Sequence, residues 1–283
     1  MLIKDWLESG KAEYGNAPDF LRLDLEVILV KVLGVKDRSF LALHQDDNLS
    51  DEQIKLADRL ARERFINEKP LAYVLSEKEF YGRRFYVDSR VLIPRPETEE
   101  IIDAVKSVAS SSMRILDVGT GSGAIAITLK LENPGLEMMA SDISDDALDV
   151  AKRNAKEHGA DIEFAKSDLL QNIGNLPDII VANLPYVDKG WSWTSRTLRF
   201  EPREALFAED GGLFEIKRLF VEICEKIIKV SDDKEIYLFL ELDPSQKNTL
   251  KNFIKGVNTK RGTKTVKIYD SNYILGYKIR RQR

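Results

Sequence analysis

The sequence predicts an α/β protein in which a mainly parallel β-sheet is covered by helices on both faces and is preceded by a helical region. Two observations support this prediction. After residue 112, short apolar segments of strand length alternate with amphipathic segments of helix length. This alternation is typical of a parallel sheet with crossover helices. Before residue 70, apolar residues recur at helical spacing only.

The first seventy or so residues are predicted to be helical. Over residues 20–32 the apolar side chains recur three or four positions apart, and Gly34 follows as a stop signal. A second helix is predicted to begin at Ser50, because Gln53 stands three residues later, as in a capping box. Pro70 comes shortly after the end of this helix.

Residues 79–93 are rich in aromatic and β-branched side chains, and we predict a β-hairpin there. Gly82-Arg83 is the expected turn, and the second strand is expected to continue to residue 93. Two prolines follow it. A helix is then predicted over residues 97–108.

The later elements alternate in type. The predicted strands are Arg114–Val118, Glu137–Ser141, Ile162–Ala165, Asp178–Ala182 and Glu235–Leu242. The predicted helices are Gly123–Leu131, Asp145–His158 (with Ser144 as its cap and Gly159 at its end), Leu213–Val230 and Ser245–Ile254. The last two strands, Thr265–Tyr269 and Ile274–Ile279, are expected to form an antiparallel edge of the sheet.

Composition narrows the class of protein. A chain of 283 residues with 43% hydrophobic and 32% charged residues is long enough for one large domain or two moderate ones. A net charge of −4 argues against general phosphate binding, so we expect no stable binding to nucleic acid. No segment approaches the ~20 apolar residues that cross a bilayer. We expect a cytoplasmic monomer without a metal site, whose single cysteine, Cys224, is packed in the core.

A glycine-rich loop, Asp-Val-Gly-Thr-Gly-Ser-Gly over residues 117–123, lies between a predicted strand and a predicted helix. Glycine permits a tight turn and close approach of a ligand, and the amides of the helix start favour a polar or anionic group. The spacing also fits dinucleotide-binding loops, so the loop alone allows NAD or S-adenosylmethionine. Asp117, which can hold the amino-acid end of S-adenosylmethionine, and the third glycine, Gly123, favour S-adenosylmethionine.

Acidic residues follow the next two strands. Asp142 comes about twenty residues after the loop, where a carboxylate can accept both ribose hydroxyls of either cofactor. Asp168 ends the third strand and is placed to contact an adenine amino group. Ligands of such sheets bind at the carboxyl ends of the strands. We therefore predict that Asp142 and Asp168 bind the cofactor.

The motif Asn183-Leu184-Pro185-Tyr186 directly follows the fourth strand and indicates the chemistry. An amide nitrogen is a poor nucleophile because its lone pair is delocalised. Asn183 Oδ1 and the Leu184 carbonyl can accept both amide hydrogens, while Pro185 fixes the backbone and Tyr186 offers a flat surface. We predict direct methyl transfer to a planar amide or amine nitrogen, with no protein nucleophile.

Six segments together resemble one known family. They are Pro70–Tyr73, Glu79–Gly82, Leu92–Glu99, Asp117–Gly123, Asn183–Tyr186 and Arg199–Leu206. The chain resembles the protein-glutamine N5-methyltransferases that act on peptide chain release factors, the HemK/PrmC family. The Ile-Pro-Arg-Pro-Glu-Thr-Glu run is the most family-specific part of this match.

The resemblance implies a Rossmann-like, seven-stranded class I methyltransferase domain over residues 94–283. It also implies a helical N-terminal, substrate-recognition domain over residues 1–78 and a hairpin linker over residues 79–93. The implied cofactor is S-adenosyl-L-methionine, and the implied substrate is the glutamine of the Gly-Gly-Gln loop of release factors. The implied cofactor residues are Gly119, Thr120, Gly121, Ser122, Gly123, Asp142, Asp168, Leu169 and Asn183; Asn183, Leu184, Pro185 and Tyr186 would hold the glutamine.

The chain departs from the family pattern in three places. Leu184 replaces a proline, which gives a motif similar to that of adenine-N6 dimethyltransferases of ribosomal RNA, so an adenine-N6 methyltransferase is one alternative. Ser76 and the turn 241–246 replace glycine-bearing versions, and we expect these two changes to affect only loops. The alternative from another class is an NAD-dependent oxidoreductase. Trp191 and Trp193 are expected to pack, with a flap over the substrate as the alternative.

Overall fold

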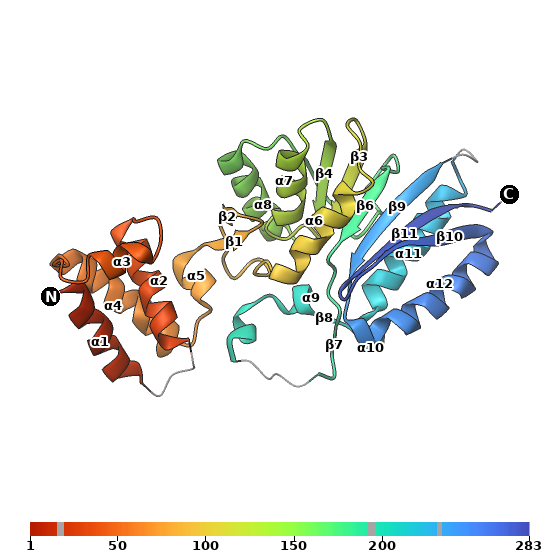
Figure 1. Cartoon of the computed structure of the whole chain (residues 1–283). Helices are drawn as coiled ribbons and strands as arrows, with labels where there is room; N and C mark the ends of the chain where they lie inside the picture. The colour runs from red at the N-terminus through yellow and green to blue at the C-terminus, as the bar shows by residue number, and fades with distance from the viewer. Residues whose placement is uncertain (16–19, 192–195, 231–233, 283) are drawn as a thin grey trace. The chain divides into compact units, whose positions relative to one another are not determined.

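The structure is a computed structural model that describes residues 1–15, 20–191, 196–230 and 234–282 (Figure 1). The described chain divides into two compact units. One contains residues 1–77 and 196–200, and the other contains residues 78–191 and 201–282. The hairpin predicted as a linker belongs to the second unit. The functional division into three segments stays a prediction.

The first unit is helical, as the sequence predicts. Its elements are α1 (Ile3–Tyr14), α2 (Leu21–Leu33), α3 (Ser39–Leu43), α4 (Asp51–Phe65), α5 (Leu71–Leu75) and the 3₁₀ helix η2 (Arg196–Phe200). Trp6, Leu25, Ile28 and Ala57 form part of its core. Both predicted helix boundaries are confirmed, because Gly34 caps α2 in the left-handed conformation and Ser50 forms a capping box at α4.

The hairpin is present but shorter than predicted. Strands β1 (Lys78–Phe80) and β2 (Arg83–Phe85) pair antiparallel. The predicted Gly82-Arg83 turn is wrong by one residue: Tyr81 and Gly82 both have positive φ, the combination that a type I′ turn requires. The second strand does not continue to residue 93, because the next backbone N–H, of Tyr86, donates to the Asn154 side chain at 2.8 Å instead.

The second unit is built on a seven-stranded sheet in the order β10-β11-β9-β6-β3-β4-β5 (Figure 1). The strands are β3 (Arg114–Val118), β4 (Glu137–Asp142), β5 (Glu163–Lys166), β6 (Ile179–Ala182), β9 (Glu235–Glu241), β10 (Thr263–Asp270) and β11 (Ile274–Arg281). Strands β3, β4, β5, β6 and β9 run parallel, and β11 is antiparallel to both β9 and β10. The predicted α/β fold and its antiparallel edge are confirmed.

Helices cover both faces of this sheet. One face packs against α6 (Glu99–Lys106, after the 3₁₀ turn η1, Pro96–Thr98), α7 (Ala124–Glu132) and α8 (Asp145–His158). The other packs against α11 (Phe214–Ile227) and α12 (Lys247–Arg261, after η3, Pro244–Gln246). The short elements β7 (Val187–Asp188), α9 (Arg203–Leu206), β8 (Phe207–Ala208) and α10 (Glu209–Gly212) lie between β6 and α11. Helix α12 continues past the predicted end at residue 254, because Val257 is also buried and Gly262 provides the cap.

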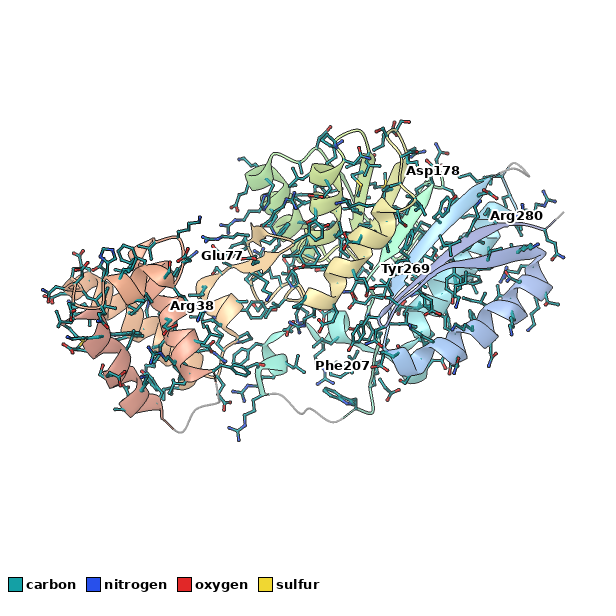
Figure 2. The ribbon with its side chains drawn as sticks, viewed as in Figure 1. Arg38, Glu77, Asp178, Phe207, Tyr269 and Arg280 are labelled. Atoms are coloured by element: carbon teal, nitrogen blue, oxygen red, sulfur yellow. The ribbon has the colours of Figure 1, made fainter. Side chains whose placement is uncertain are left out.

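The central strands are apolar on both faces. In β6, Ile179 and Val181 join the core beneath α6 and α7, whereas Ile180 and Ala182 join the core beneath α11. Successive side chains of a strand point to opposite faces, so a strand covered on both sides reads as one apolar run. Polar side chains are therefore displaced to the strand ends. In Figure 2, Asp178 lies at the amino end of β6 and Phe207 lies toward the opposite edge.

Candidate active site

A cavity of about 500 Å³ lies at the carboxyl ends of β3, β4, β5 and β6, within the second unit. Its volume falls in the range of about 300–1,000 Å³ found for ligand sites. The predicted residues that line it are Gly119, Thr120, Gly121, Ser122, Asp142, Asp168, Leu169, Asn183, Leu184 and Pro185. Three other predicted residues, Asp117, Gly123 and Tyr186, do not line the cavity.

The glycine loop needs its glycines for two different reasons. Gly121 has φ 55°, and a Cβ there would meet no atom within 4 Å, so this position is open as well as left-handed. Gly123 has φ 81°, and a Cβ there would lie 2.9 Å from Ile127 Cδ1 and 3.2 Å from Ala151 Cβ. Gly121 thus keeps the backbone accessible to a ligand, whereas Gly123 lets α7 pack closely against α8.

Asp117 lies beneath the loop and is fully buried. Its Oδ2 accepts a hydrogen bond from the Thr120 hydroxyl at 2.6 Å. Burial raises the pKa of Asp117 to about 7, although hydrogen bonds from Thr120 and from the backbone of Ala126 oppose this rise. In this structure Asp117 supports the loop from below, and its contact with the amino-acid end of a cofactor stays a prediction.

Asp142, the predicted ribose ligand, lines the cavity. Its Oδ2 accepts the Gly121 N–H at 2.9 Å and its Oδ1 accepts the Ser144 N–H at 3.0 Å, so the carboxylate is fixed at the cavity wall. Burial raises the pKa of Asp142, and the backbone hydrogen bonds oppose that rise. The next residue, Ile143, also lines the cavity and is 60% exposed. Sequence reasoning missed it, although an apolar residue directly after a strand-end acid was a usable signal.

Asp168 is held by a residue that the sequence did not suggest. Its Oδ2 accepts hydrogen bonds from Arg218 Nη2 at 2.8 Å and from Gln171 Nε2 at 3.0 Å. Arg218 comes from α11, also bonds Glu215 at 2.7 Å, and lines the cavity. Fifty residues separate Asp168 from Arg218, so only the fold brings the pair together.

Asn183 leaves the end of β6 with its side-chain amide in a defined orientation. Its Nδ2 donates to Thr98 Oγ1 at 3.1 Å, and Thr98 is buried. Because the donor side of the amide is engaged, the acceptor Oδ1 is left for a ligand. Leu184, the departure from the family motif, is buried and packs against the glycine loop: a Cβ at Gly119 would lie 3.0 Å from Leu184 Cδ2.

Tyr186 is anchored behind the cavity at two points. Its hydroxyl donates to Glu241 Oε1 at 3.1 Å, and its backbone carbonyl accepts from Gln246 Nε2 at 2.7 Å. Burial, together with the Glu241 charge, raises the pKa of Tyr186. Glu241 and Gln246 are the two ends of the turn 241–246, which departs from the family pattern. From the sequence, we expected this departure to affect only a loop. That prediction is incomplete, because this turn holds the motif in place.

Comparisons with known proteins agree with this geometry. A model of the PrmC N-terminal domain matches residues 5–75, and a model of the methyltransferase small domain matches residues 98–216. The chain is 42% identical over 225 residues to the release factor glutamine methyltransferase of Neisseria gonorrhoeae, an alignment that covers 77% of this chain and 78% of that protein.

Two further relatives carry the same name. The protein of Lactococcus lactis is 35% identical over 237 residues, covering 82% of this chain and 85% of that one, and the protein of Chlorobaculum tepidum is 42% identical over 206 residues, covering 67% and 69%. The chain belongs to the release factor glutamine methyltransferase family. Membership confirms the resemblance drawn from the sequence and assigns the chain to the methyltransferases rather than the oxidoreductases.

The most family-specific run, residues 93–99, had no role assigned from sequence. In the structure, Arg95 Nη2 donates to Glu201 Oε1 at 2.6 Å, and the Ile93 N–H donates to Glu201 Oε2 at 3.0 Å. Glu99 accepts the Tyr81 N–H at 2.9 Å. These bonds tie the run to the hairpin and to Glu201, and its member Thr98 reaches the cavity.

The tryptophan pair gave a different outcome. Trp191 is 43% exposed, so the expectation that it packs is wrong. Trp193 lies outside the described residues.

Within the described part of the chain, no helix combines the length and apolar character needed to cross a membrane. Among the same residues, no cluster of three or more histidine, cysteine or acidic side chains is arranged to hold a metal ion.

Proposed function

We propose that this chain transfers a methyl group from S-adenosyl-L-methionine to the side-chain amide nitrogen of the glutamine in the Gly-Gly-Gln loop of peptide chain release factors. The observation that carries the proposal is the orientation of Asn183. Its Nδ2 is bonded to Thr98, so its Oδ1 remains as a hydrogen-bond acceptor in a residue that lines the cavity. An acceptor is what an amide N–H requires.

The cavity suits S-adenosylmethionine. The open backbone at Gly121 and the fixed carboxylate of Asp142 would hold the amino-acid and ribose parts. Asp168, Leu169 and Ile143 also line the cavity and would pack against the adenine. When bound, this cofactor supplies an electrophilic methyl group on a positively charged sulfur. The chain itself contributes binding and orientation.

The reaction is a direct displacement at the methyl carbon. Asn183 Oδ1 and the Leu184 carbonyl accept the two hydrogens of the substrate amide and aim its nitrogen at the methyl group. The carbon–nitrogen bond forms as the carbon–sulfur bond breaks, and the amide then loses one proton to solvent. Orienting two reactants in this way is worth several kcal/mol, up to about 7–11, of the barrier.

The first unit is the proposed recognition domain for the protein substrate. It matches the PrmC N-terminal domain over residues 5–75, and that match favours a release factor over a nucleic acid as substrate. The net charge of −4 points the same way, because enzymes that act on RNA usually carry a basic surface.

The test is a transfer assay. The purified protein is mixed with labelled S-adenosylmethionine and a bacterial release factor, beside a Gly-Gly-Gln→Gly-Gly-Asn factor and ribosomal RNA. We expect label on the wild-type factor alone. Label on RNA only would replace the proposal with adenine-N6 methylation, and label on both factors would exclude the loop glutamine as the target.

A further inference from the structure

A buried polar cluster lies behind Asn183. Strands β6 and β9 are parallel neighbours, with Ala182 opposite Leu240, so the next residue of each, Asn183 and Glu241, emerges on the same face of the sheet. This face is covered by α6, and Thr98 stands at the start of that helix. Side chains from three segments that are far apart in sequence therefore meet at one point.

Burial makes the hydrogen bonds of this cluster consequential. Thr98 is 4% exposed and Glu241 is 1% exposed. Asn183 donates to Thr98, and Tyr186 donates to Glu241 Oε1. The other carboxylate oxygen, Oε2, has no close hydrogen-bond partner among the described residues. Burial raises the pKa of Glu241, while the nearby polar side chains of Thr98, Tyr186 and Asn183 oppose that rise.

The orientation of an asparagine amide is decided by its neighbours. The oxygen and nitrogen ends have nearly the same shape, so rotation by half a turn exchanges an acceptor for a donor at almost no steric cost. Thr98 alone cannot choose between the two orientations, because a hydroxyl can donate or accept. A carboxylate can only accept. If the Thr98 hydroxyl proton is directed at a charged Glu241, its lone pairs are left to accept from Asn183 Nδ2.

We propose that Glu241 and Thr98 are positioning residues that hold the Asn183 amide with Oδ1 facing the cavity, so that the substrate amide meets an acceptor rather than a donor. The inference rests on the proposed function. It assigns a role to Thr98, within the Ile-Pro-Arg-Pro-Glu-Thr-Glu run, and to Glu241. Neither residue needs to touch the substrate, since both act through Asn183.

Three variants test the orientation. Thr98→Val keeps the shape of the side chain and removes the hydroxyl, whereas Thr98→Ser retains the hydroxyl. Glu241→Gln keeps the shape but adds a donor. We expect Thr98→Val and Glu241→Gln to lower kcat about tenfold, the loss that corresponds to one misdirected hydrogen bond. The dissociation constant of S-adenosylmethionine should be unchanged, and Thr98→Ser should restore most of the rate.

Thr263→Val is the matched control. Thr263 is also a buried threonine of the second unit, 1% exposed, and its hydroxyl donates to Asn258 Oδ1 at 2.9 Å in a part of the unit that does not line the cavity. The same chemical change is made there without touching Asn183. It should lower Tm by a similar amount and leave kcat at the wild-type value. Equal losses of kcat in Thr98→Val and Thr263→Val would overturn the inference.

A binding cycle shows whether Thr98 acts through Asn183. The affinity of a Gly-Gly-Gln peptide is measured by calorimetry in the presence of S-adenosylhomocysteine. Thr98→Val should weaken binding severalfold in the wild-type background and have no further effect in the Asn183→Ala background. Additive losses would refute the positioning role.

A spectroscopic measurement keeps this inference separate from the proposed function. In ¹⁵N-labelled protein the Asn183 side-chain amide gives a pair of resonances, assigned by their loss in Asn183→Ala. Thr98→Val and Glu241→Gln should shift them and speed their hydrogen exchange, even in a protein that methylates no release factor. Unchanged resonances would overturn the inference, whereas a wild-type protein that labels no release factor would overturn only the proposed function.

Discussion

The titration of Asp117 gives a quantitative expectation about stability. Burial raises the pKa of this carboxyl from an ordinary value of 3.8 to about 7 in the folded protein. Between these two values the folded protein retains a proton that the unfolded chain has released. The free energy of unfolding therefore falls as the pH rises through this window, and Asp117→Asn removes that dependence while preserving the size of the side chain.

The magnitude follows from the width of the window. It spans about three pH units, and each unit is worth about 1.4 kcal/mol, so the full effect is about 4 kcal/mol. Between pH 5 and pH 8, Asp117 should account for a loss of about 2–3 kcal/mol in the free energy of unfolding. A pH-independent loss of stability caused by the asparagine would shift the whole curve of unfolding free energy against pH. It would not change the difference in slope between the wild type and Asp117→Asn.

Cys224 provides the assay. It is the only cysteine of the chain and is fully buried in α11 of the second unit, where burial raises the pKa of its thiol to about 11. Its thiol is therefore labelled only when that unit unfolds. Brief thiol labelling across a urea series at pH 5, 6, 7 and 8 yields the free energy of unfolding for the wild type and for Asp117→Asn.

Asp88→Asn is the matched control for charge removal. Burial tends to raise the pKa of Asp88, but hydrogen bonds from Arg90 and Tyr86 outweigh it and leave the pKa at about 2. Its stabilising contribution is complete above pH 4 and is lost only as the pH falls toward 2. Asp88→Asn should thus lower stability equally from pH 5 to pH 8. Parallel pH curves for the wild type and Asp117→Asn would refute the account of Asp117.

Four other substitutions have distinct expected results. Asp142→Ala should weaken S-adenosylmethionine binding in calorimetry, whereas Asn183→Ala should abolish turnover with the dissociation constant nearly unchanged; the reverse pattern would exchange the two roles. Gly123→Ala places a side chain at φ 81° against α8 and should cost at least 1–2 kcal/mol in urea unfolding, roughly the left-handed penalty alone. Arg95→Ala leaves the buried Glu201 carboxylate without its ion pair and should cost about 3 kcal/mol, which Glu201→Gln in the same chain should partly restore.

Local signals in the sequence predicted most of the secondary structure. The capping box at Ser50, the glycine after α2 and the cap and stop of α8 fall where the sequence places them, because each involves hydrogen bonds within one turn of a helix. The extra residues of α12 and the shorter hairpin were not predicted. The length of each of these two elements depends on what the segment packs against or bonds to. In the hairpin, for example, the Tyr86 N–H bonds to Asn154, which lies 68 positions away in the sequence.

The sequence by itself determined the location and type of the candidate site. Parallel strands must be apolar on both faces, so Asp142, Asp168 and Asn183 could stand only at strand ends, and the carboxyl ends of such strands meet at one edge. Only the tertiary structure decided which partners hold these groups. Arg218 beside Asp168, Thr98 beside Asn183 and Glu241 beside Tyr186 each join segments about 50 to 85 residues apart. Strand order and register set these pairs, and neither is encoded in the spacing of residues along the chain.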